Sequence, residues 1–203
     1  MSVLAKEYLV SDWSSNGFLD WRIQEFKGMT RYTLTDHSGY KVVQVKSENS
    51  ASVLYKNIEI NINKTPIINW SWMASFFNET GLEKTESERT KLGDDFVLRI
   101  YVVASAGPLP WQKNSIVYVM ARGEAVGNYW SNPFTNRAII YVADNYNLLV
   151  GSWVTHKINI KTDFKRFFNQ DVDTIEGVAL MTDTDNSEAE ALAYYGDIYF
   201  SKD

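Results

Sequence analysis

Alternating apolar and polar positions run through most of the chain and predict β-strands. In Asp95–Ala104, the side chains of Phe96, Leu98, Ile100 and Val102 share one face. A spacing of two residues is typical of a strand, because successive side chains point to opposite sides of the sheet. The other face is also largely apolar, so we expect this strand to lie at the centre of a sheet.

The same alternation recurs along the rest of the sequence. Further strands are expected at Glu7–Val10, Arg31–Thr35, Tyr40–Lys46, Ala51–Ile62, Ile67–Ala74, Ser115–Ala121, Arg137–Ala143, Trp153–Ile160, Thr174–Thr182 and Ala191–Phe200. Only Thr162–Phe168 has helical spacing, and Thr162 is the expected N-cap of a short helix. Many strands with one short helix predict an all-β fold, an antiparallel β-sandwich, in a single domain over residues 1–203.

Composition and charge narrow the classes of function. The net charge is −5 and no run of Lys or Arg occurs, so nucleic acid is not an expected partner. The chain has no Cys, which excludes disulfides, thiol catalysis and cysteine-based zinc sites. Its apolar stretches are too short to cross a bilayer, so membrane insertion is not expected. The first residues, MSVLAKEYLVSDW, lack the pattern of a signal peptide.

Carboxylates gather at two places that a sheet can bring together. Asp94 and Asp95 stand at the start of the expected central strand, and Asp183 and Asp185 lie in the polar loop between the last two strands. They can bind Arg99 and backbone amides in the loop, hold a cation such as calcium, or act as general acid and base. The sequence leaves these three roles open.

A further carboxylate, Asp197, lies inside the aromatic closing strand. Burying a carboxylate is costly unless it is paired, hydrogen-bonded or bound to a metal. We therefore expect either a structural calcium ion or a buried donor at Asp197.

Tryptophans fall into two groups. Trp70 and Trp72 lie in a regular strand and are expected in the core. Trp111 and Trp130 lie in loops rich in Gly, Pro and Asn, where a flat ring with a polar tip suits stacking on a sugar. The ligand-binding residues expected on this basis are Trp111, Tyr118, Trp130, Arg137 and Asn186.

Three segments carry a resemblance to a known family. In order, KLGDDFVLRIYVV (Lys91–Val103), GVALMTDTDN (Gly177–Asn186) and AYYGDIYF (Ala193–Phe200) resemble the bacterial domain of unknown function 3047. The resemblance implies a secreted or periplasmic protein with no established activity.

The Tyr-rich closing strand is also similar, more weakly, to jelly-roll carbohydrate-binding modules of the galactose-binding-like type. That resemblance implies that the first and last strands pair, and that a structural calcium lies near Asp197.

Three functions are compatible with these features. The first is a non-catalytic module that binds a carbohydrate or polysaccharide. The second is a glycan-active enzyme that uses the Asp cluster; its two carboxyl groups would lie about 5–5.5 Å apart for retention or about 6.5–9.5 Å apart for inversion. The third is a structural or protein-binding component of the bacterial envelope, which a flat apolar surface would favour.

Overall fold

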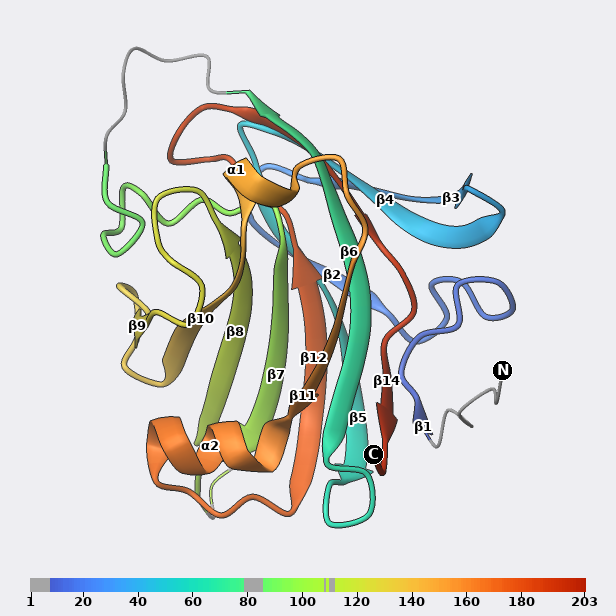
Figure 1. Cartoon of the computed structure of the whole chain (residues 1–203), viewed down its shortest axis with the longest axis vertical. Helices are drawn as coiled ribbons and strands as arrows, with labels where there is room; N and C mark the ends of the chain where they lie inside the picture. Colours follow the sequence, from blue (N-terminus) through green and yellow to red (C-terminus); the bar gives the residue numbers. More distant parts are fainter. Residues whose placement is uncertain (1–7, 79–85, 108, 110–111) are drawn as a thin grey trace.

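The computed structural model describes residues 8–78, 86–107, 109 and 112–203. Within these residues, two seven-stranded sheets lie face to face (Figure 1). Sheet A runs in the order β1 (Tyr8–Leu9), β14 (Tyr199–Ser201), β6 (Ile67–Asn78), β13 (Glu190–Tyr195), β4 (Tyr40–Glu48) and β3 (Arg31–His37), with β11 (Val154–Asn159) paired to β6.

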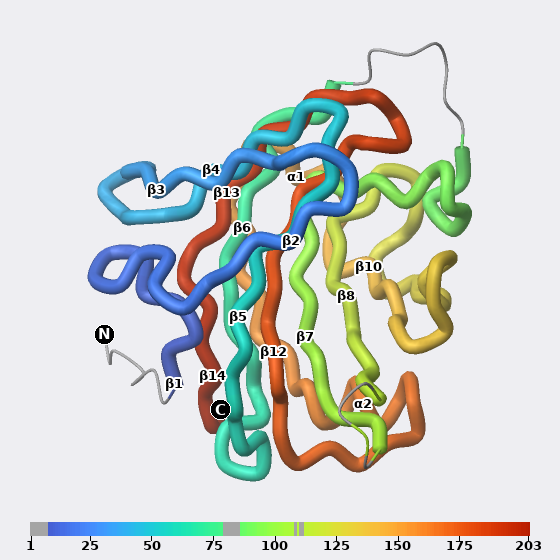
Figure 2. Tube along the Cα trace, turned by 180° about the vertical axis from the view of Figure 1, so that it is seen from behind, coloured from blue at the N-terminus to red at the C-terminus, as the bar shows by residue number. Residues whose placement is uncertain are grey.

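Sheet B forms the other layer, and Figure 2 shows its strands side by side. Its order is β2 (Arg22–Lys27), β5 (Ala51–Asn61), β12 (Thr174–Met181), β7 (Arg99–Ser105), β8 (Lys113–Ala121), β10 (Ala138–Asn145) and β9 (Tyr129–Ser131). The predicted all-β sandwich of the jelly-roll type is confirmed.

The main core lies between the two sheets. Trp70 and Trp72 of β6 are buried there, which confirms their predicted role, and they face Ile100 and Val102 of β7. Alternation along β7 therefore turns Arg99 and the residues in phase with it to the outer face of sheet B. This outer face carries smaller apolar clusters of its own.

The longer helix closes one end of the sandwich. α2 (Ile160–Phe168) crosses the lower ends of β7 and β8 in Figure 1, with Phe164 buried in the core. Its N-cap is Asn159, whose side chain accepts a hydrogen bond from the Thr162 amide at 3.1 Å. The prediction of Thr162 as the cap was wrong by one turn, because the helix begins at Ile160. A second, short helix, α1 (Tyr146–Leu149), follows β10.

One strand pair departs from the predicted antiparallel arrangement. β10 runs parallel to β8, with Ala138 opposite Ser115. Parallel neighbours need a long connection, and the segment 122–137, which includes β9, supplies it. This connection returns the chain to the end of the sheet from which β8 started.

Two predicted strands are confirmed in place but differ in extent. The predicted central strand, Asp95–Ala104, begins only at Arg99, and it lies in the middle of sheet B between β12 and β8. The predicted closing strand, Ala191–Phe200, is interrupted at Gly196 and forms β13 and β14. β14 pairs with β1, as expected for the first and last strands. No helix in the described part of the chain is long and apolar enough to span a membrane.

Candidate functional site

The structure brings the two acidic segments together at one rim of sheet B. The loop after β12 meets the irregular segment that precedes β7. The amide of Asp183 donates to the carbonyl of Phe96 at 3.3 Å, and the amide of Phe96 donates to Asp183 Oδ1 at 3.1 Å. These bonds occupy the backbone groups that would otherwise extend β7 toward Asp95.

Arg99 is the centre of this rim, and its bonds to the carboxylates confirm one of the roles that the sequence left open. Its side chain is fully buried, and it donates to both oxygens of Asp183, at 3.0 Å and 2.6 Å. It also donates to Asp94, to Oδ2 at 3.2 Å and to the backbone carbonyl. The guanidinium lies 4.6 Å from the centre of the Phe96 ring. A buried arginine held this way is a fixed part of the fold.

Charge and burial act against each other in this cluster. Burial would lower the pKa of Arg99, but the carboxylates of Asp183 and Asp94 outweigh it and hold that pKa well above its usual value. Burial raises the pKa of Asp94, and the nearby Arg99 offsets this only in part. Arg99 therefore remains charged at any physiological pH.

Asp95 has a different role, because it holds the loop after β12. It accepts hydrogen bonds from the backbone and side chain of Asn186, at 3.1 Å each, and from the amide and hydroxyl of Ser187, at 2.7 Å and 2.6 Å. Both of its oxygens are engaged. Asp95 is thus a structural acceptor, one of the three roles that the sequence left open.

Asp185 completes the rim and is its half-buried member. Its pKa is raised by burial and by the charge of Asp95, while Lys27 acts in the opposite direction. Oxygens of Asp95, Asp183 and Asp185 lie within 4.8 Å of one another, so these three could share a cation.

A groove of about 550 Å³ opens beside the rim on the outer face of sheet B. Its lining combines the rings of Phe26, Tyr101 and Phe134, the amides of Asn132 and Asn186, and the charged residues Asp94, Arg99, Asp183 and Asp185. Asp94 is buried, and its Oδ1 has no hydrogen-bond partner among the described residues. We call this cavity the acidic groove.

The structure does not bring all of the predicted ligand-binding residues to one site. Asn186 lines the acidic groove. Tyr118 is fully buried between the sheets and donates to Asp163 at 2.7 Å, so its ring does not reach a surface site in this structure. Trp130 is half-buried under Arg89, Arg137 is exposed at the start of β10, and Trp111 lies outside the described residues.

Asp197 has the buried donor that the sequence analysis offered as an alternative to calcium. The amide of Trp13 donates to its Oδ1 at 3.0 Å. Asp197 belongs to no three-residue metal-ligating group in the described ranges. A calcium ion at Asp197 stays a prediction, and chelation would lower the melting temperature if the native state bound one.

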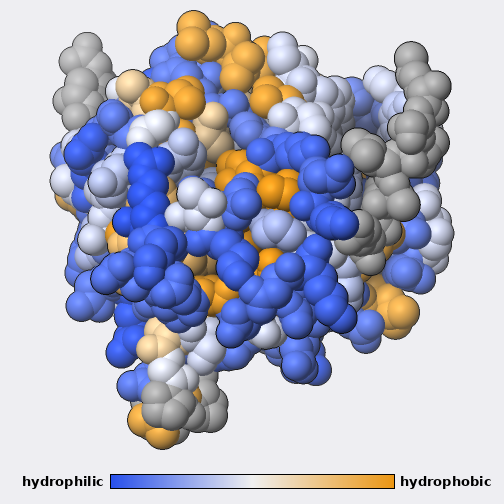
Figure 3. All heavy atoms as spheres, turned by 60° about the horizontal axis from the view of Figure 1, so that its bottom comes forward, coloured by the Kyte–Doolittle hydropathy of each residue, from blue (hydrophilic) through white to orange (hydrophobic). Residues whose placement is uncertain are grey.

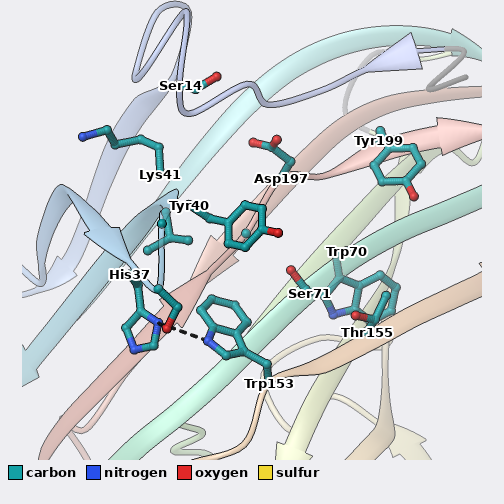
Figure 4. Close-up of a pocket in the computed structure, with 14 residues that line it drawn as sticks. Ser14, His37, Tyr40, Lys41, Trp70, Ser71, Trp153, Thr155, Asp197 and Tyr199 are labelled. Atoms are coloured by element: carbon teal, nitrogen blue, oxygen red, sulfur yellow. Dashed lines mark hydrogen bonds between the residues drawn. The ribbon is translucent and has the colours of Figure 1, made fainter. Parts of the chain in front are cut away.

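Asp197 lines a second cavity, of about 590 Å³, on the outer face of sheet A. Its walls include the rings of Tyr40, Trp153 and Tyr199, with Ser71 and Thr155 beside them (Figure 4). We call this cavity the aromatic pocket. No local pattern in the sequence indicates this pocket, because its residues come from separate strands and loops, and only Tyr40, beside the turn glycine Gly39, carries a local signal of exposure.

Comparison with known proteins identifies the family. No curated protein sequence matches the chain. Similar solved structures include a thermostable cellulase derived from Cel12A of Rhodothermus marinus (TM-score 0.49, 9% identity, 91% of this chain and 92% of that chain). Another is a carbohydrate-binding module, CBM28, described as specific for non-crystalline cellulose (TM-score 0.48, 10% identity, 94% and 92%).

A third similar structure is the glycoside hydrolase domain of Endo-D from Streptococcus pneumoniae R6 (TM-score 0.41, 9% identity). The match covers 90% of this chain but only 21% of that longer one. At these identities the likeness concerns the fold alone. The family described as "Protein of unknown function (DUF3047)" matches residues 19–199, and the chain therefore belongs to that family.

Proposed function

We propose that the protein binds a saccharide in the acidic groove and does not hydrolyse it. One observation supports this proposal. Aromatic rings and amides line the groove, and the carboxylates at its base already accept hydrogen bonds from Arg99 and from the amides of the loop. A small-molecule site of this kind combines apolar walls with a few fixed polar groups.

The groove offers both kinds of contact that a sugar ring uses. The rings of Phe26 and Phe134 are 61% and 59% exposed, so they present apolar faces to a ligand. Asn132 and Asn186 supply amide donors and acceptors, and Asp94 Oδ1 is an acceptor without a partner in the described part of the chain. Sugar hydroxyls both donate and accept hydrogen bonds, which matches this mixture.

The carboxylates favour binding over catalysis. A glycosidase needs one carboxylic acid and one carboxylate that both reach the substrate. Both oxygens of Asp183 accept from Arg99, and both oxygens of Asp95 accept from the loop. A proton transfer through either group would break these buried bonds.

Affinity electrophoresis in gels that contain neutral polysaccharides tests the proposal. We expect retardation of the wild-type protein by at least one polysaccharide and loss of retardation in the double variant Phe26→Ala, Phe134→Ala. Leu148→Ala, which removes an even more exposed apolar side chain outside both cavities, is the control. Equal retardation of the wild type and the groove variant would contradict the proposal.

A glycan-active enzyme is the second candidate, and Asp185 favours it. This residue lines the groove, is only half-buried and has a raised pKa, as a general acid requires. Release of reducing ends from the bound polysaccharide, abolished by Asp185→Asn, would establish this function in place of simple binding.

A protein-binding envelope component is the third possibility. Figure 3 shows the end of the molecule formed by the lower part of Figure 1, where hydrophilic atoms surround only small apolar patches. A broad apolar docking face is therefore lacking in this view. As part of the proposal we place the protein in the periplasm or outside the cell, which fractionation of the native host would test.

A further inference from the structure

The aromatic pocket lies on the opposite side of the sandwich from the acidic groove. Segments distant in the sequence build it: the loop that holds Ser14, the tip of the β3–β4 hairpin, the middle of β6, the start of β11 and the junction of β13 with β14. Its volume of about 590 Å³ is in the range of small-molecule sites.

The pocket is held in shape by specific contacts. The indole Nε1 of Trp153 donates to His37 Nδ1 at 3.3 Å, shown as the dashed line in Figure 4. The ring of His37 also lies 5.0 Å from that of Tyr194. Trp153 is therefore fixed in place although it is 37% exposed.

A glycine sets the opposite wall. The amide of Gly196 donates to the carbonyl of Ser71 at 2.9 Å, and a Cβ at Gly196 would lie 2.2 Å from Ser71 Oγ. A side chain at this position would therefore displace the Ser71 hydroxyl from its present place. Asp197 and Ser71 both line the pocket (Figure 4).

The rings of the pocket are available to a ligand. Tyr40 is 76% exposed, far above the usual value for a packed aromatic residue. Together with Trp153 it presents two aromatic surfaces on one cavity (Figure 4). Aromatic surfaces of this kind suit either a sugar ring or an organic cation.

The polar groups decide between these two ligands. Ser71 and Thr155 add hydroxyls that bond to either donors or acceptors, and Asp197 adds a carboxylate acceptor. Sugar hydroxyls can donate hydrogen bonds to these oxygens, whereas a quaternary ammonium group has no N–H or O–H to donate.

We infer that the aromatic pocket is a second saccharide-binding site, separate from the acidic groove. The class of ligand in this inference rests on the proposed function. The location of the second site rests only on the geometry of the aromatic pocket. Two sites on opposite faces would let one molecule hold two chains of a polysaccharide, or two parts of one chain, with increased avidity.

Indole N–H resonances of the ¹⁵N-labelled full chain test this inference. The probes are cellohexaose, xylohexaose, mannohexaose and chitohexaose, and Trp153→Phe assigns the resonance of Trp153. We expect at least one probe to shift that resonance in the wild type and equally in Phe26→Ala, Phe134→Ala. Tyr40→Ala should weaken the titration of Trp153 at least tenfold and leave the melting temperature unchanged. The control Leu148→Ala should change neither the titration nor the melting temperature.

Each other outcome overturns something specific. If a probe binds the groove but the Trp153 resonance does not move, the aromatic pocket is not a saccharide site while the proposed function stands. If the shift disappears in the groove variant, only one site exists. If no probe binds and polysaccharide gels retard nothing, both the second site and the proposed function are wrong. An unchanged titration in Tyr40→Ala would also contradict the second site.

Discussion

The acidic groove and the aromatic pocket are built on opposite principles. The groove has charged residues at its floor, and they are bonded to one another around the buried Arg99. The pocket has one carboxylate, Asp197, and is shaped by rings and by the close approach at Gly196. A buried charge network is stable only when complete, whereas an aromatic wall tolerates the loss of one member. Loss of a buried charge should therefore destabilise the region of the groove, whereas a steric change should disturb the pocket.

The largest expected effect is the loss of Arg99. Arg99→Met leaves the buried carboxylates of Asp183 and Asp94 without their cation, and we expect the free energy of unfolding in urea to fall by about 3–5 kcal/mol. Arg137→Met, at an exposed position, is the control and should change it by less than about 0.5 kcal/mol. A loss below about 1 kcal/mol for Arg99→Met would show that the network is not essential to the groove.

The next effect concerns the anchor of the groove's loop. Asp95→Asn keeps the size of the side chain but turns an amide toward donors of Asn186 and Ser187, so we expect a loss of about 2 kcal/mol in the same measurement. Asp171→Asn removes an exposed carboxylate paired with Lys165 and should have almost no effect. Equal stability of the two variants would mean that Asp95 does not hold the loop.

The pocket offers the corresponding test of shape. Gly196→Ala places a methyl group against Ser71 Oγ, and we expect a loss of about 1 kcal/mol in thermal or urea unfolding. Ser71→Ala removes the clashing oxygen, so the double variant should recover most of that loss. Additive losses in the double variant would instead place the strain in the backbone.

The smallest expected effect is that of Asp185→Asn on the melting temperature, and it distinguishes the contribution of charge from that of packing in the groove. The pKa of Asp185 is raised above its ordinary value of 3.8 by burial and by Asp95. Between that value and the raised pKa, the folded state binds more protons than the unfolded state, so this group's contribution to stability falls as pH rises. Asp185→Asn should therefore raise the melting temperature at pH 7.

The pH dependence of the same variant provides the control for this prediction. The gain from Asp185→Asn should shrink as the pH falls, because the raised pKa makes the wild-type carboxylate take up its proton more readily in the folded state than in the unfolded state. Melting curves of both proteins from pH 4 to pH 8 measure this difference. A gain that does not change with pH would point to packing, and a loss at pH 7 would show that Lys27 stabilises the charged form more than Asp95 destabilises it.

Local patterns predicted much of the fold. The alternation in Asp95–Ala104 predicted a central strand, and its apolar faces account for the place of β7 in sheet B. The same reasoning failed at residues 95–98, because the backbone there bonds to the loop after β12 and not to a neighbouring strand along its whole length. Side-chain spacing indicates a strand but does not indicate which partner its amides will find.

The candidate sites were predicted less completely. The acidic residues and Asn186 could be found from the sequence, since carboxylates next to apolar strands stand out. Arg99 was one of several possible partners for these carboxylates, and only the loop from residue 183, folded over it, shows that it is the centre of the network. Tyr118 seemed suited to a surface site, and only the packing of α2 beside it shows that it is interior.

The sequence by itself determined the class of fold, the central strand, the pairing of the closing segment with the first strand, and the acidic rim, because each follows from residues close together in the chain or from a family pattern. The tertiary structure alone decided the parallel pair β8–β10, the ion pairs of Arg99 and the whole of the aromatic pocket. The pocket, for example, depends on contacts between His37 and Trp153 and between Ser71 and Gly196, residues that are more than 100 positions apart. Periodicity describes a segment, whereas a cavity exists only after distant segments have packed.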